Sequence, residues 1–469
     1  MKLQPYPEYK DSGVPWLGEI PQHWQALPNR ALFNEVNARN HPEEPLLSVT
    51  ISKGVIRQTD LLANTSKKDS SNENKANYKL VQPRDIAYNK MRAWQGAVGV
   101  SNYRGIVSPA YIVVRLRGEQ NPEYFHYLLR TPAFAKEAER WSYGITSDQW
   151  SLRAEDFKQI YCALPPKEEQ DAIAALLAYA DRRTNRIIRT KRRLIELLNE
   201  QKQVIIHRAV TRGLDPNVRL KPSGIDWLGD VPEGWEVMAL RMRYSVQLGK
   251  MLDTKRITGS HLVPYLRNTD VQWDGINSTN LPMMDIPERE YERYLVKPGD
   301  LLVCEGGDVG RSAFWDDALP MCGYQKALHR LRPTSNGREC PRFLFYVLFA
   351  ASKRGIFIAD GSENTIAHLT AEKLRRHRFA FPPKTEQEAI ALHLDTTLND
   401  LEQAVERANH TIDLLREYRT RLIADVVTGK LDVVDVELPA LDEIEAPEDW
   451  ETDEDNEADE MDEMEGVTA

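Results

Sequence analysis

The sequence predicts an α+β fold with a pseudo-two-fold internal repeat, in which two mixed α/β regions are joined by two long helices that pair as a coiled coil. Three observations predict this fold. A long helical segment starting at Pro166 occurs again 217 positions later. A short tryptophan-containing motif precedes each α/β region. Between motif and helix, short β-like and helical runs alternate in both halves.

The two long helices carry the clearest repeat. Ala163-Leu-Pro-Pro-Lys-Glu-Glu-Gln returns as Ala380-Phe-Pro-Pro-Lys-Thr-Glu-Gln. Tandem prolines suit a helix N-terminus, and Gly213 followed by Pro216 ends the first copy. Apolar side chains follow at alternating spacings of four and three, the average of 3.5 that is typical of a coiled-coil seam. The predicted seam consists of Ile173, Leu177, Ile187, Leu194, Leu198 and Ile205 in the first copy and Ile390, Leu394, Leu401, Leu415 and Leu422 in the second.

The charges of the two helices favour pairing with one another. Residues 166–212 carry a net charge of +5, and residues 383–430 carry −3. Opposite net charge favours pairing of the two copies over pairing of like copies, although each exposed ion pair contributes little. The faithful repeat disfavours the alternative of two unrelated surface helices.

The tryptophan motif is also duplicated. Residues 11–24 and 222–235 share the pattern Trp-Leu-Gly followed by Pro-x-x-Trp, so that Trp16 and Trp24 correspond to Trp227 and Trp235. Glycine and proline indicate a compact loop, and the indoles are expected to hold it against apolar side chains. Stacking of these rings on nucleic-acid bases is the less favoured alternative.

The two α/β regions share the alternation of short strands and helices but differ in most residues. In the first, Leu46–Ile51 and Pro109–Leu116 are predicted strands, Pro122–Arg130 is a predicted helix, and the polar stretch 64–77 is a predicted exposed loop. The predicted division of the chain is 1–164 for the first region with its motif, 165–215 for the first helix, 216–381 for the second region, 382–432 for the second helix and 433–469 for an acidic tail expected to be disordered. Little beyond framework positions such as Asp85 and Asp300, each in a Pro-x-Asp turn, is shared, which favours different binding surfaces on one scaffold.

Net charge is misleading when taken over the whole chain. The total is −10 over 469 residues, but residues 435–469 hold 17 Asp and Glu and neither Lys nor Arg, so the remainder carries +7. A mildly basic body fits a nucleic-acid binder. The tail has three open roles, which are solubility, moderation of DNA affinity and contact with a partner subunit. Four isolated cysteines and the lack of a long apolar run favour a cytoplasmic protein with no membrane contact.

Catalytic chemistry is not evident. No metal-binding cluster and no nucleophile paired with a base is found, so no catalytic and no metal-ligating residue is predicted. The glycines of Glu305-Gly-Gly-Asp-Val-Gly-Arg311 fit no nucleotide-binding pattern. They make either a tight turn or a close approach to a DNA phosphate beside Arg311, and the sequence leaves both alternatives open.

The combined pattern resembles the DNA-specificity (S) subunit of Type I restriction–modification systems over nearly all of residues 1–432. The resemblance rests on the Gly13-Val-Pro-Trp-Leu-Gly motif, the paired Pro-Pro-x-x-Glu-Gln helices, and segments such as Asn89-Lys-Met-Arg-Ala-Trp and Gly299-Asp-Leu-Leu-Val-Cys. It implies two target-recognition domains on an antiparallel helical pair that sets the gap of an asymmetric, bipartite site in double-stranded DNA. It also implies a chain without catalysis or cofactor of its own, two modification (methyltransferase) subunits that bind S-adenosylmethionine, and up to two ATP- and Mg²⁺-dependent restriction subunits.

Candidate DNA-binding residues follow from side-chain chemistry, because Arg and Lys suit guanine and phosphate while Asn and Gln suit adenine. They are Lys53, Arg57, Lys90, Arg92, Gln95, Arg104 and Gln149 in the first region, and Lys250, Lys255, Arg256, Arg267, Asn268, Gln272, Arg311, Gln325 and Lys326 in the second. For each of them a solvated surface role is an equally open alternative. Two other functions remain, a single-chain restriction–methylation enzyme and a coiled-coil scaffold without a DNA role.

Overall fold

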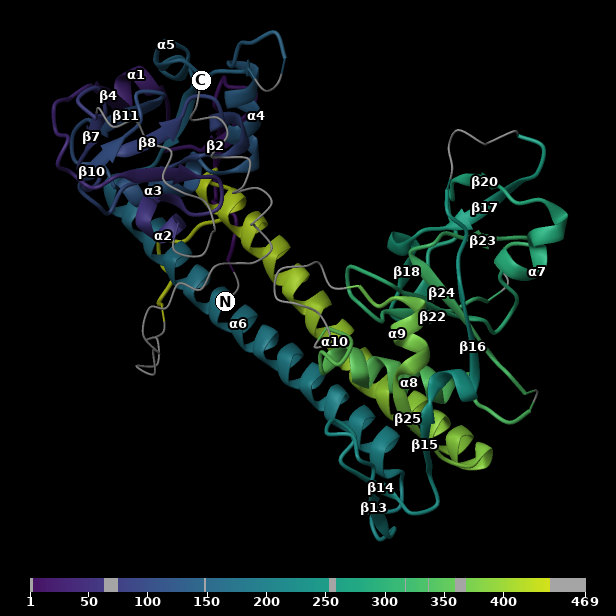
Figure 1. Ribbon diagram of the computed structural model, residues 1–469. Helices are drawn as coiled ribbons and strands as arrows, with labels where there is room; N and C mark the ends of the chain where they lie inside the picture. Colours follow the sequence, from purple (N-terminus) through teal and green to yellow (C-terminus); the bar gives the residue numbers. More distant parts are fainter. Residues whose placement is uncertain are drawn as a thin grey trace. The chain divides into compact units, whose positions relative to one another are not determined.

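The computed structural model describes residues 3–62, 75–146, 149–252, 259–316, 318–335, 337–358 and 368–438 (Figure 1). The chain forms two compact units, each described here by itself. Unit 1 comprises Met1–Thr190 and His410–Ala469, and unit 2 comprises Lys191–Asn409. Most of the predicted loop 64–77 and the acidic tail beyond Leu438 lie outside the described residues.

Unit 1 contains short strands and helices followed by the first half of a long helix. Its elements are β1 (Tyr9–Asp11), β2 (Glu19–Pro21), β3 (Gln25–Pro28), α1 (Asn29–Leu32), β4 (Phe33–Val36), β5 (Leu47–Thr50), β6 (Gly54–Arg57), α2 (Gln58–Leu62), β7 (Lys79–Val81), β8 (Ile86–Asn89), η1 (Ala93–Gln95), β9 (Val98–Val100), β10 (Gly105–Val107), β11 (Tyr111–Leu116), α3 (Pro122–Leu128), α4 (Pro132–Arg140), α5 (Ala154–Phe157), β12 (Tyr161–Leu164) and the start of α6 (Lys167–Arg212). The predicted strands and helix of this region are present, with bounds shifted by a few residues.

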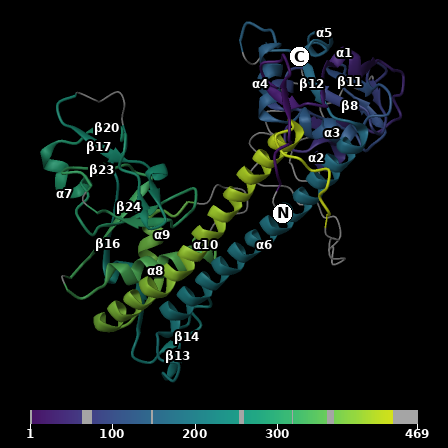
Figure 2. The ribbon, with the colours of Figure 1, turned by 180° about the vertical axis from the view of Figure 1, so that it is seen from behind.

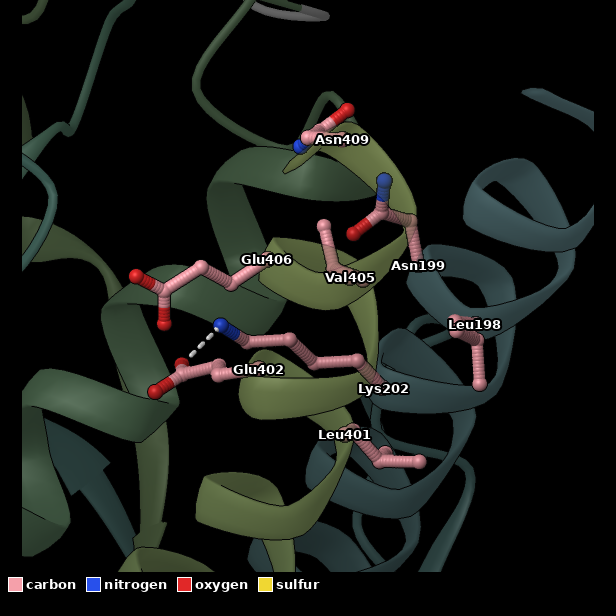
Figure 3. Close-up of a pocket in the computed structure, with 8 residues that line it drawn as sticks. All are labelled: Leu198, Asn199, Lys202, Leu401, Glu402, Val405, Glu406 and Asn409. Atoms are coloured by element: carbon pink, nitrogen blue, oxygen red, sulfur yellow. Dashed lines mark hydrogen bonds and ion pairs between the residues drawn. The ribbon is translucent and has the colours of Figure 1, made fainter. Parts of the chain in front are cut away.

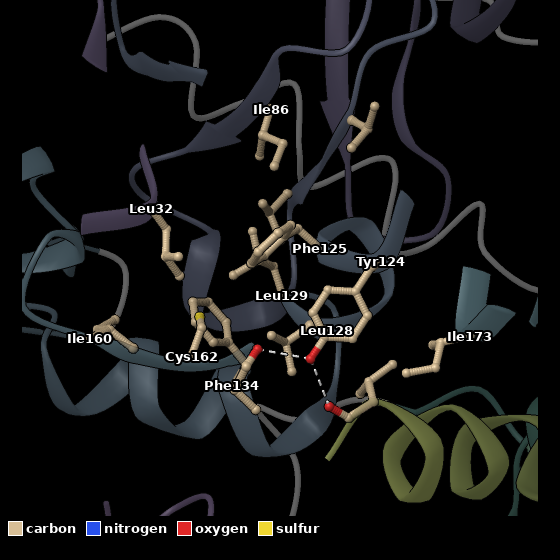
Figure 4. Packing of buried hydrophobic residues seen from close by; sticks show 14 of the residues in the cluster. Leu32, Ile86, Tyr124, Phe125, Leu128, Leu129, Phe134, Ile160, Cys162 and Ile173 are labelled. Atoms are coloured by element: carbon tan, nitrogen blue, oxygen red, sulfur yellow. Dashed lines mark hydrogen bonds between the residues drawn. The ribbon is translucent and has the colours of Figure 1, made fainter. Parts of the chain in front are cut away.

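An antiparallel sheet of order β4-β11-β8-β9 is the centre of unit 1. Its long strand β11 reads Tyr-Ile-Val-Val, and these four side chains are buried, as expected for a β-branched run covered on both faces. Helices α3 and α4 begin with proline after the capping side chains of Asn121 and Thr131. In the core, the Tyr124 hydroxyl lies within hydrogen-bond distance of the backbone carbonyls of Ala163 and Val427, which ties α3 to β12 and to the end of α10 (Figure 4).

Unit 2 repeats this plan with different insertions. Its elements are the end of α6, β13 (Leu220–Pro222), β14 (Asp230–Pro232), β15 (Glu236–Ala239), η3 (Leu240–Met242), β16 (Tyr244–Leu248), β17 (Leu262–Leu266), η5 (Asn268–Asp270), β18 (Val271–Gln272), β19 (Gly275–Ile276), β20 (Met283–Asp285), η6 (Glu288–Glu290), α7 (Tyr291–Tyr294), β21 (Leu301–Cys304), β22 (Ser312–Phe314), β23 (Gly323–Tyr324), β24 (Leu328–Pro333), α8 (Pro341–Lys353), α9 (Ala371–Arg376), β25 (Arg378–Phe381) and the start of α10 (Lys384–Val427).

The central sheet of unit 2, β16-β24-β21-β22, matches that of unit 1 strand for strand. The outer pairs β13-β14 and β15-β25 match β1-β2 and β3-β12 in the same way. The added layers also correspond: unit 1 has the β5-β6 hairpin and the β7-β10 pair, linked by a parallel bridge between Leu46 and Ile106, and unit 2 has the sheet β20-β17-β23, whose β17-β23 pair is parallel as well. Unit 2 adds the β18-β19 hairpin between β17 and β20. The scaffold is therefore duplicated, and the insertions and side chains that it carries have diverged.

Helices α6 and α10 lie side by side and antiparallel within each unit (Figures 1 and 2). In unit 1 the beginning of α6, at Ile173 and Leu177, shares a core with Val426 and Val427 at the end of α10. In unit 2 the end of α6, at Ile206 and Val210, shares a core with residues 390–398 at the beginning of α10. The predicted pairing of the two copies is confirmed.

The predicted seam is buried at its ends and differs from the expectation in the middle. Ile173, Leu177, Ile390 and Leu394 are fully buried, but Leu194 is 40% exposed. Ile187 is only half-buried, as are Leu198, Ile205, Leu401 and Leu415, whereas Leu422 is buried. Ile188, one position beyond the predicted Ile187, is buried, and so is Ile412, which lies between the predicted Leu401 and Leu415. The cause is helical periodicity, because a helix with 3.6 residues per turn drifts by about 20° per heptad from a strict 3.5 repeat.

A hollow in unit 2 is lined by side chains of both α6 and α10 (Figure 3). It has a volume of about 320 Å³. Its lining combines Leu198, Leu401 and Val405 with polar residues, and the Lys202 ammonium forms an ion pair there with Glu402.

Candidate nucleic-acid interface

The tryptophan motif is fixed to the start of a long helix in each unit. The indole Nε1–H of Trp24 donates to Glu169 Oε1 at 2.9 Å, and that of Trp235 donates to Glu386 Oε1 at 3.1 Å. Both tryptophans are at most 1% exposed. Packing rather than stacking on bases is therefore their role, as the sequence favoured.

The glutamine next to each of these glutamates holds a second loop. Gln170 donates to the Pro165 carbonyl and accepts from the Asn121 backbone N–H, both at 2.9 Å. Gln387 makes the same two contacts, with the Pro382 carbonyl and the Cys340 N–H, again at 2.9 Å. The repeated Glu-Gln pair thus positions each α/β region on its helix. Sequence reasoning used this motif to detect the repeat and missed what its side chains do.

Four candidates of unit 1 gather after strand β8. Lys90 and Arg92 lie in the turn that follows it, and Gln95 ends η1. The indole of Trp94 packs edge-on against Trp150, with ring centroids 5.3 Å apart, which brings the loop of Gln149 to this turn. Backbone contact between Leu152 N–H and the Lys90 carbonyl, at 2.8 Å, fixes the same approach. Side chains of Gln95 and Gln149 are exposed here.

The remaining candidates of unit 1 lie on and beside the β5-β6 hairpin. Lys53 is in its turn, which Arg130 supports from below with hydrogen bonds of 2.6 Å to the carbonyls of Ile51 and Ser52. Arg57 ends β6 with its guanidinium 4.8 Å from the centre of the Tyr103 ring. Arg104, next to that ring, forms a 2.7 Å ion pair with Glu44. Arg130 is a positioning residue that the sequence did not reveal, because its acceptors are backbone atoms far away in the chain.

In unit 2 the structure brings seven of the nine candidates together. They lie at the ends of neighbouring strands. Lys250 and Gln325 form a β-bridge, and the Lys326 N–H donates to the Lys250 carbonyl. The Gln325 N–H donates to the carbonyl of Leu266, which precedes Arg267 in the chain. Arg311 donates to the Asn268 carbonyl, and Gln272 donates to the carbonyl of Thr269, the residue after Asn268. The other two, Lys255 and Arg256, lie outside the described residues.

Some of the charged side chains among these seven already have an ion-pair partner within unit 2. Arg267 grips Asp270 with Nε and Nη2 at 2.9 and 2.8 Å, and Lys250 forms an ion pair with Glu290. Asp270 is buried, which raises the pKa of a carboxyl group, but the hydrogen bonds from Arg267 outweigh burial and lower its pKa. Lys326, in contrast, is exposed, and the described residues hold no ion-pair partner for its ammonium.

The glycine-rich turn after β21 owes one glycine to packing. Gly310 has φ +87°, and a Cβ there would lie 2.6 Å from the Phe357 ring. Arg311 Nη2 donates to the Asn268 carbonyl at 2.9 Å, so this guanidinium is used within the unit. These contacts favour the tight-turn alternative over a close approach to phosphate.

The described residues contain neither a membrane-spanning helix nor a metal-binding cluster. None of their helices is both long and apolar enough to cross a membrane. Within the same ranges, no three His, Cys, Asp or Glu side chains gather as a metal site would require.

Comparison with known proteins gives the family. The model of the Type I restriction modification DNA specificity domain matches twice, at residues 33–197 and 232–408. A Methanocaldococcus jannaschii protein described as the specificity subunit of the type I restriction enzyme MjaX is 24% identical over 443 residues, covering 89% of this chain and 96% of its own. The specificity subunit of the Escherichia coli type I restriction enzyme EcoBI is 28% identical over 195 residues, 40% of this chain and 38% of its own.

Solved structures agree in fold. A chain from a study of complex assembly and conformational transition of the type I R-M system superposes with a TM-score of 0.67 at 16% identity, covering 88% of this chain and 99% of its own. The HsdS subunit from Thermoanaerobacter tengcongensis gives a TM-score of 0.50 at 18% identity, with 88% and 98% covered. With two matches to the family model, one centred on the α/β region of each unit, the chain belongs to the Type I restriction–modification DNA specificity family.

Proposed function

We propose that this chain selects the DNA sequence for a Type I restriction–modification complex, with each unit reading one half of a bipartite site. The observation that carries the proposal is a duplicated scaffold with unlike additions: the two central sheets match strand for strand, whereas the candidate residues differ between the units and one of them, Gln272, lies on the β18-β19 hairpin that unit 2 adds. Two similar frames with different binding surfaces suit two different half-sites. The recognised sequence is therefore asymmetric, with unspecified bases between its halves.

The paired helices supply the second part of the proposal. Two long helices shared by both units, antiparallel within each, suit a spacer between two DNA-reading surfaces and a surface for other subunits. Two modification subunits would dock there and bring S-adenosylmethionine, and restriction subunits would bring ATP and Mg²⁺. This chain itself would bind no cofactor, transfer no methyl group and act in the cytoplasm.

A comparison of methylated bases tests the specificity. Genome-wide methylation is mapped in cells with the gene, without it, and with Arg92→Ala/Gln95→Ala. The gene should be required for one asymmetric, bipartite motif, and the double variant should relax only one half of that motif. Arg153→Ala, an exposed arginine of the same unit, is the matched control and should leave the motif unchanged. A contiguous or palindromic motif would contradict the proposal.

A second test separates this function from that of a single-chain enzyme. The purified full chain is incubated with duplex DNA and radiolabelled S-adenosylmethionine, alone and with its modification subunit. Transfer should require the modification subunit. Clear transfer by this chain alone would assign it the catalytic function instead.

A further inference from the structure

Unit 1 carries an unpaired cluster of positive charge on helix α6. Arg182, Arg183, Arg186 and Arg189 are all exposed, and the described residues provide no ion-pair partner for any of their guanidinium groups. Arg182, Arg186 and Arg189 follow one another at spacings of four and three, so they line one face of the helix. We call these four residues the arginine stripe.

The repeat shows that the scaffold does not need this stripe. In α10 the positions 217 residues later hold Asn399, Asp400, Gln403 and Glu406, which are exposed as well. A charge of +4 in one copy is thus replaced by −2 in the other. Positions that hold the scaffold together are retained in both copies, as Glu169 and Glu386 are. A feature found in one copy alone fits a partner that is present once.

The chain itself contains such a partner. Residues 439–469 include 15 Asp and Glu and no Lys or Arg. The last described residue before the acidic segment is Leu438, whose side chain packs against the core of unit 1, the core that also contains Leu176 and Leu177 of α6. The acidic segment therefore starts in the unit that carries the stripe.

Reach is sufficient for contact between the two. Along α6, the stripe ends about 18 Å from Leu177, which belongs to the core that Leu438 packs against. A chain of 31 residues spans up to about 100 Å when extended and averages roughly 30 Å between its ends when unstructured. Attachment to the same chain makes the effective concentration of the acidic segment millimolar or higher. Single exposed ion pairs are weak, but four guanidinium groups facing many carboxylates can exchange partners without losing charge contact.

We propose that the arginine stripe is the docking surface for the acidic C-terminal segment, residues 439–469, of the same chain. The contact is electrostatic and holds no fixed geometry, so salt or a competing polyanion releases it. The proposal does not depend on the DNA sequence that the chain selects.

Zero-length cross-linking of the full chain tests the contact. Arg186→Lys/Arg189→Lys preserves the charge and introduces amines that a carbodiimide joins to adjacent carboxylates. We expect amide links from these lysines to residues 439–469, within one molecule when ¹⁵N-labelled and unlabelled chains are mixed, and a several-fold loss of links in 1 M NaCl. Arg39→Lys/Arg153→Lys, exposed arginines of the same unit, is the matched control. Equal linking of the control lysines, or links mainly between molecules, would overturn the proposal.

A second measurement removes the charge instead. The full chain with all four stripe residues changed to Gln should lose its acidic segment to a glutamate-specific protease several-fold faster than the unchanged chain. A variant with the same loss of charge elsewhere in unit 1, namely Arg39→Gln, Arg84→Gln, Lys136→Gln and Arg153→Gln, should not. An unchanged cleavage rate in the stripe variant, with a loss of affinity for a non-specific duplex, would assign the stripe to DNA and overturn the proposal.

Discussion

Arg115 closes on the carboxylate of Asp85 with two hydrogen bonds, from Nε to Oδ1 at 2.6 Å and from Nη2 to Oδ2 at 2.9 Å. Asp85 is only 1% exposed and also accepts the Gln82 backbone N–H at 2.8 Å. In unit 2, Asp300 accepts in the same way from Lys297 N–H and from Arg332. The Pro-x-Asp turn is therefore a repeated joint that ties the entry of one sheet strand to the central strand.

Removal of this joint should destabilise unit 1. Asp85→Ala loses one backbone and two charged hydrogen bonds, and we expect it to lower the free energy of unfolding by roughly 2–3 kcal/mol. The urea-unfolding midpoint of the full chain measures the change. Asp60→Ala, at an exposed position of α2, is the control and should shift the midpoint little. Equal midpoints for the two variants would contradict a structural role of Asp85.

The two helix-start glutamates should differ in importance. Glu169 accepts from the Trp24 indole, from the Tyr6 hydroxyl and from His23, whereas Glu386 accepts, among the described residues, from the side chain of Trp235 only. A glutamine offers one acceptor oxygen and introduces an NH₂ group that faces another donor. Glu169→Gln should cost about 1–3 kcal/mol and Glu386→Gln less. Hydrogen exchange, followed separately for the amides of each unit, measures the loss of stability in the two variants. Unit 1 in Glu169→Gln should lose more protection than unit 2 in Glu386→Gln.

Glycine in the turn after β21 is required for a steric reason. Gly310→Ala combines a left-handed backbone conformation with a Cβ placed 2.6 Å from Phe357, so strain and overpacking add up to about 2–4 kcal/mol. Gly307 is also left-handed, but its Cβ would meet only Asn268 Nδ2 at 3.4 Å. Gly307→Ala should therefore cost less, and comparison of the melting temperatures decides. A Gly310→Ala chain as stable as the unchanged chain would show that Phe357 can move away.

His126 should make unit 1 sensitive to acid. Burial, together with the charges of Arg130 and Arg419, lowers the pKa of His126 to about 3, and its Nδ1 accepts the Val100 N–H at 3.3 Å. The unfolded chain takes up this proton below about pH 6.5 and the folded chain only near pH 3. Stability is therefore lost as the pH falls from about 6.5 towards 3.

Urea-unfolding midpoints between pH 7 and pH 5 measure the effect of this histidine. His126→Asn should have a flatter pH dependence than the unchanged chain. His393→Gln, at an exposed position of α10, should keep the slope. The same slope in all three chains would show that other groups cause the acid sensitivity.

Local pattern predicted the fold because the repeat doubles each signal. The Pro-Pro-x-x-Glu-Gln starts and the apolar spacing identified α6 and α10, and Gly213 identified the end of α6, to within a few residues. The middle of the seam was less predictable. Leu194 fits the heptad but is 40% exposed, because helical drift turns it outward and Ile188 faces inward instead.

The candidate site could be predicted only by residue type. Side-chain chemistry suggested Lys250, Arg267 and Lys326 alike, and sequence carries no sign that Glu290 and Asp270 occupy two of them. The supporting contacts of Arg130 were also hidden, because they are made to backbone carbonyls that only the fold brings near. Features that depend on the spacing of residues along the chain could therefore be predicted, and side-chain partners that only the fold brings together could not.

That distinction gives the last prediction, a separation of two candidates that the sequence treats alike. Lys326 is exposed on a backbone fixed by hydrogen bonds to Lys250, so Lys326→Ala should leave stability unchanged and weaken binding of the complex to DNA. A base contact would cost about 1–3 kcal/mol at one position of the site, and a phosphate contact would weaken all sequences equally. Arg267→Ala should instead lower the stability of unit 2, since it leaves the buried Asp270 without its partner. DNA affinity and the urea-unfolding midpoint are measured for both variants. We expect the affinity to fall in Lys326→Ala and the midpoint to fall in Arg267→Ala. A loss of stability in Lys326→Ala would remove it from the interface.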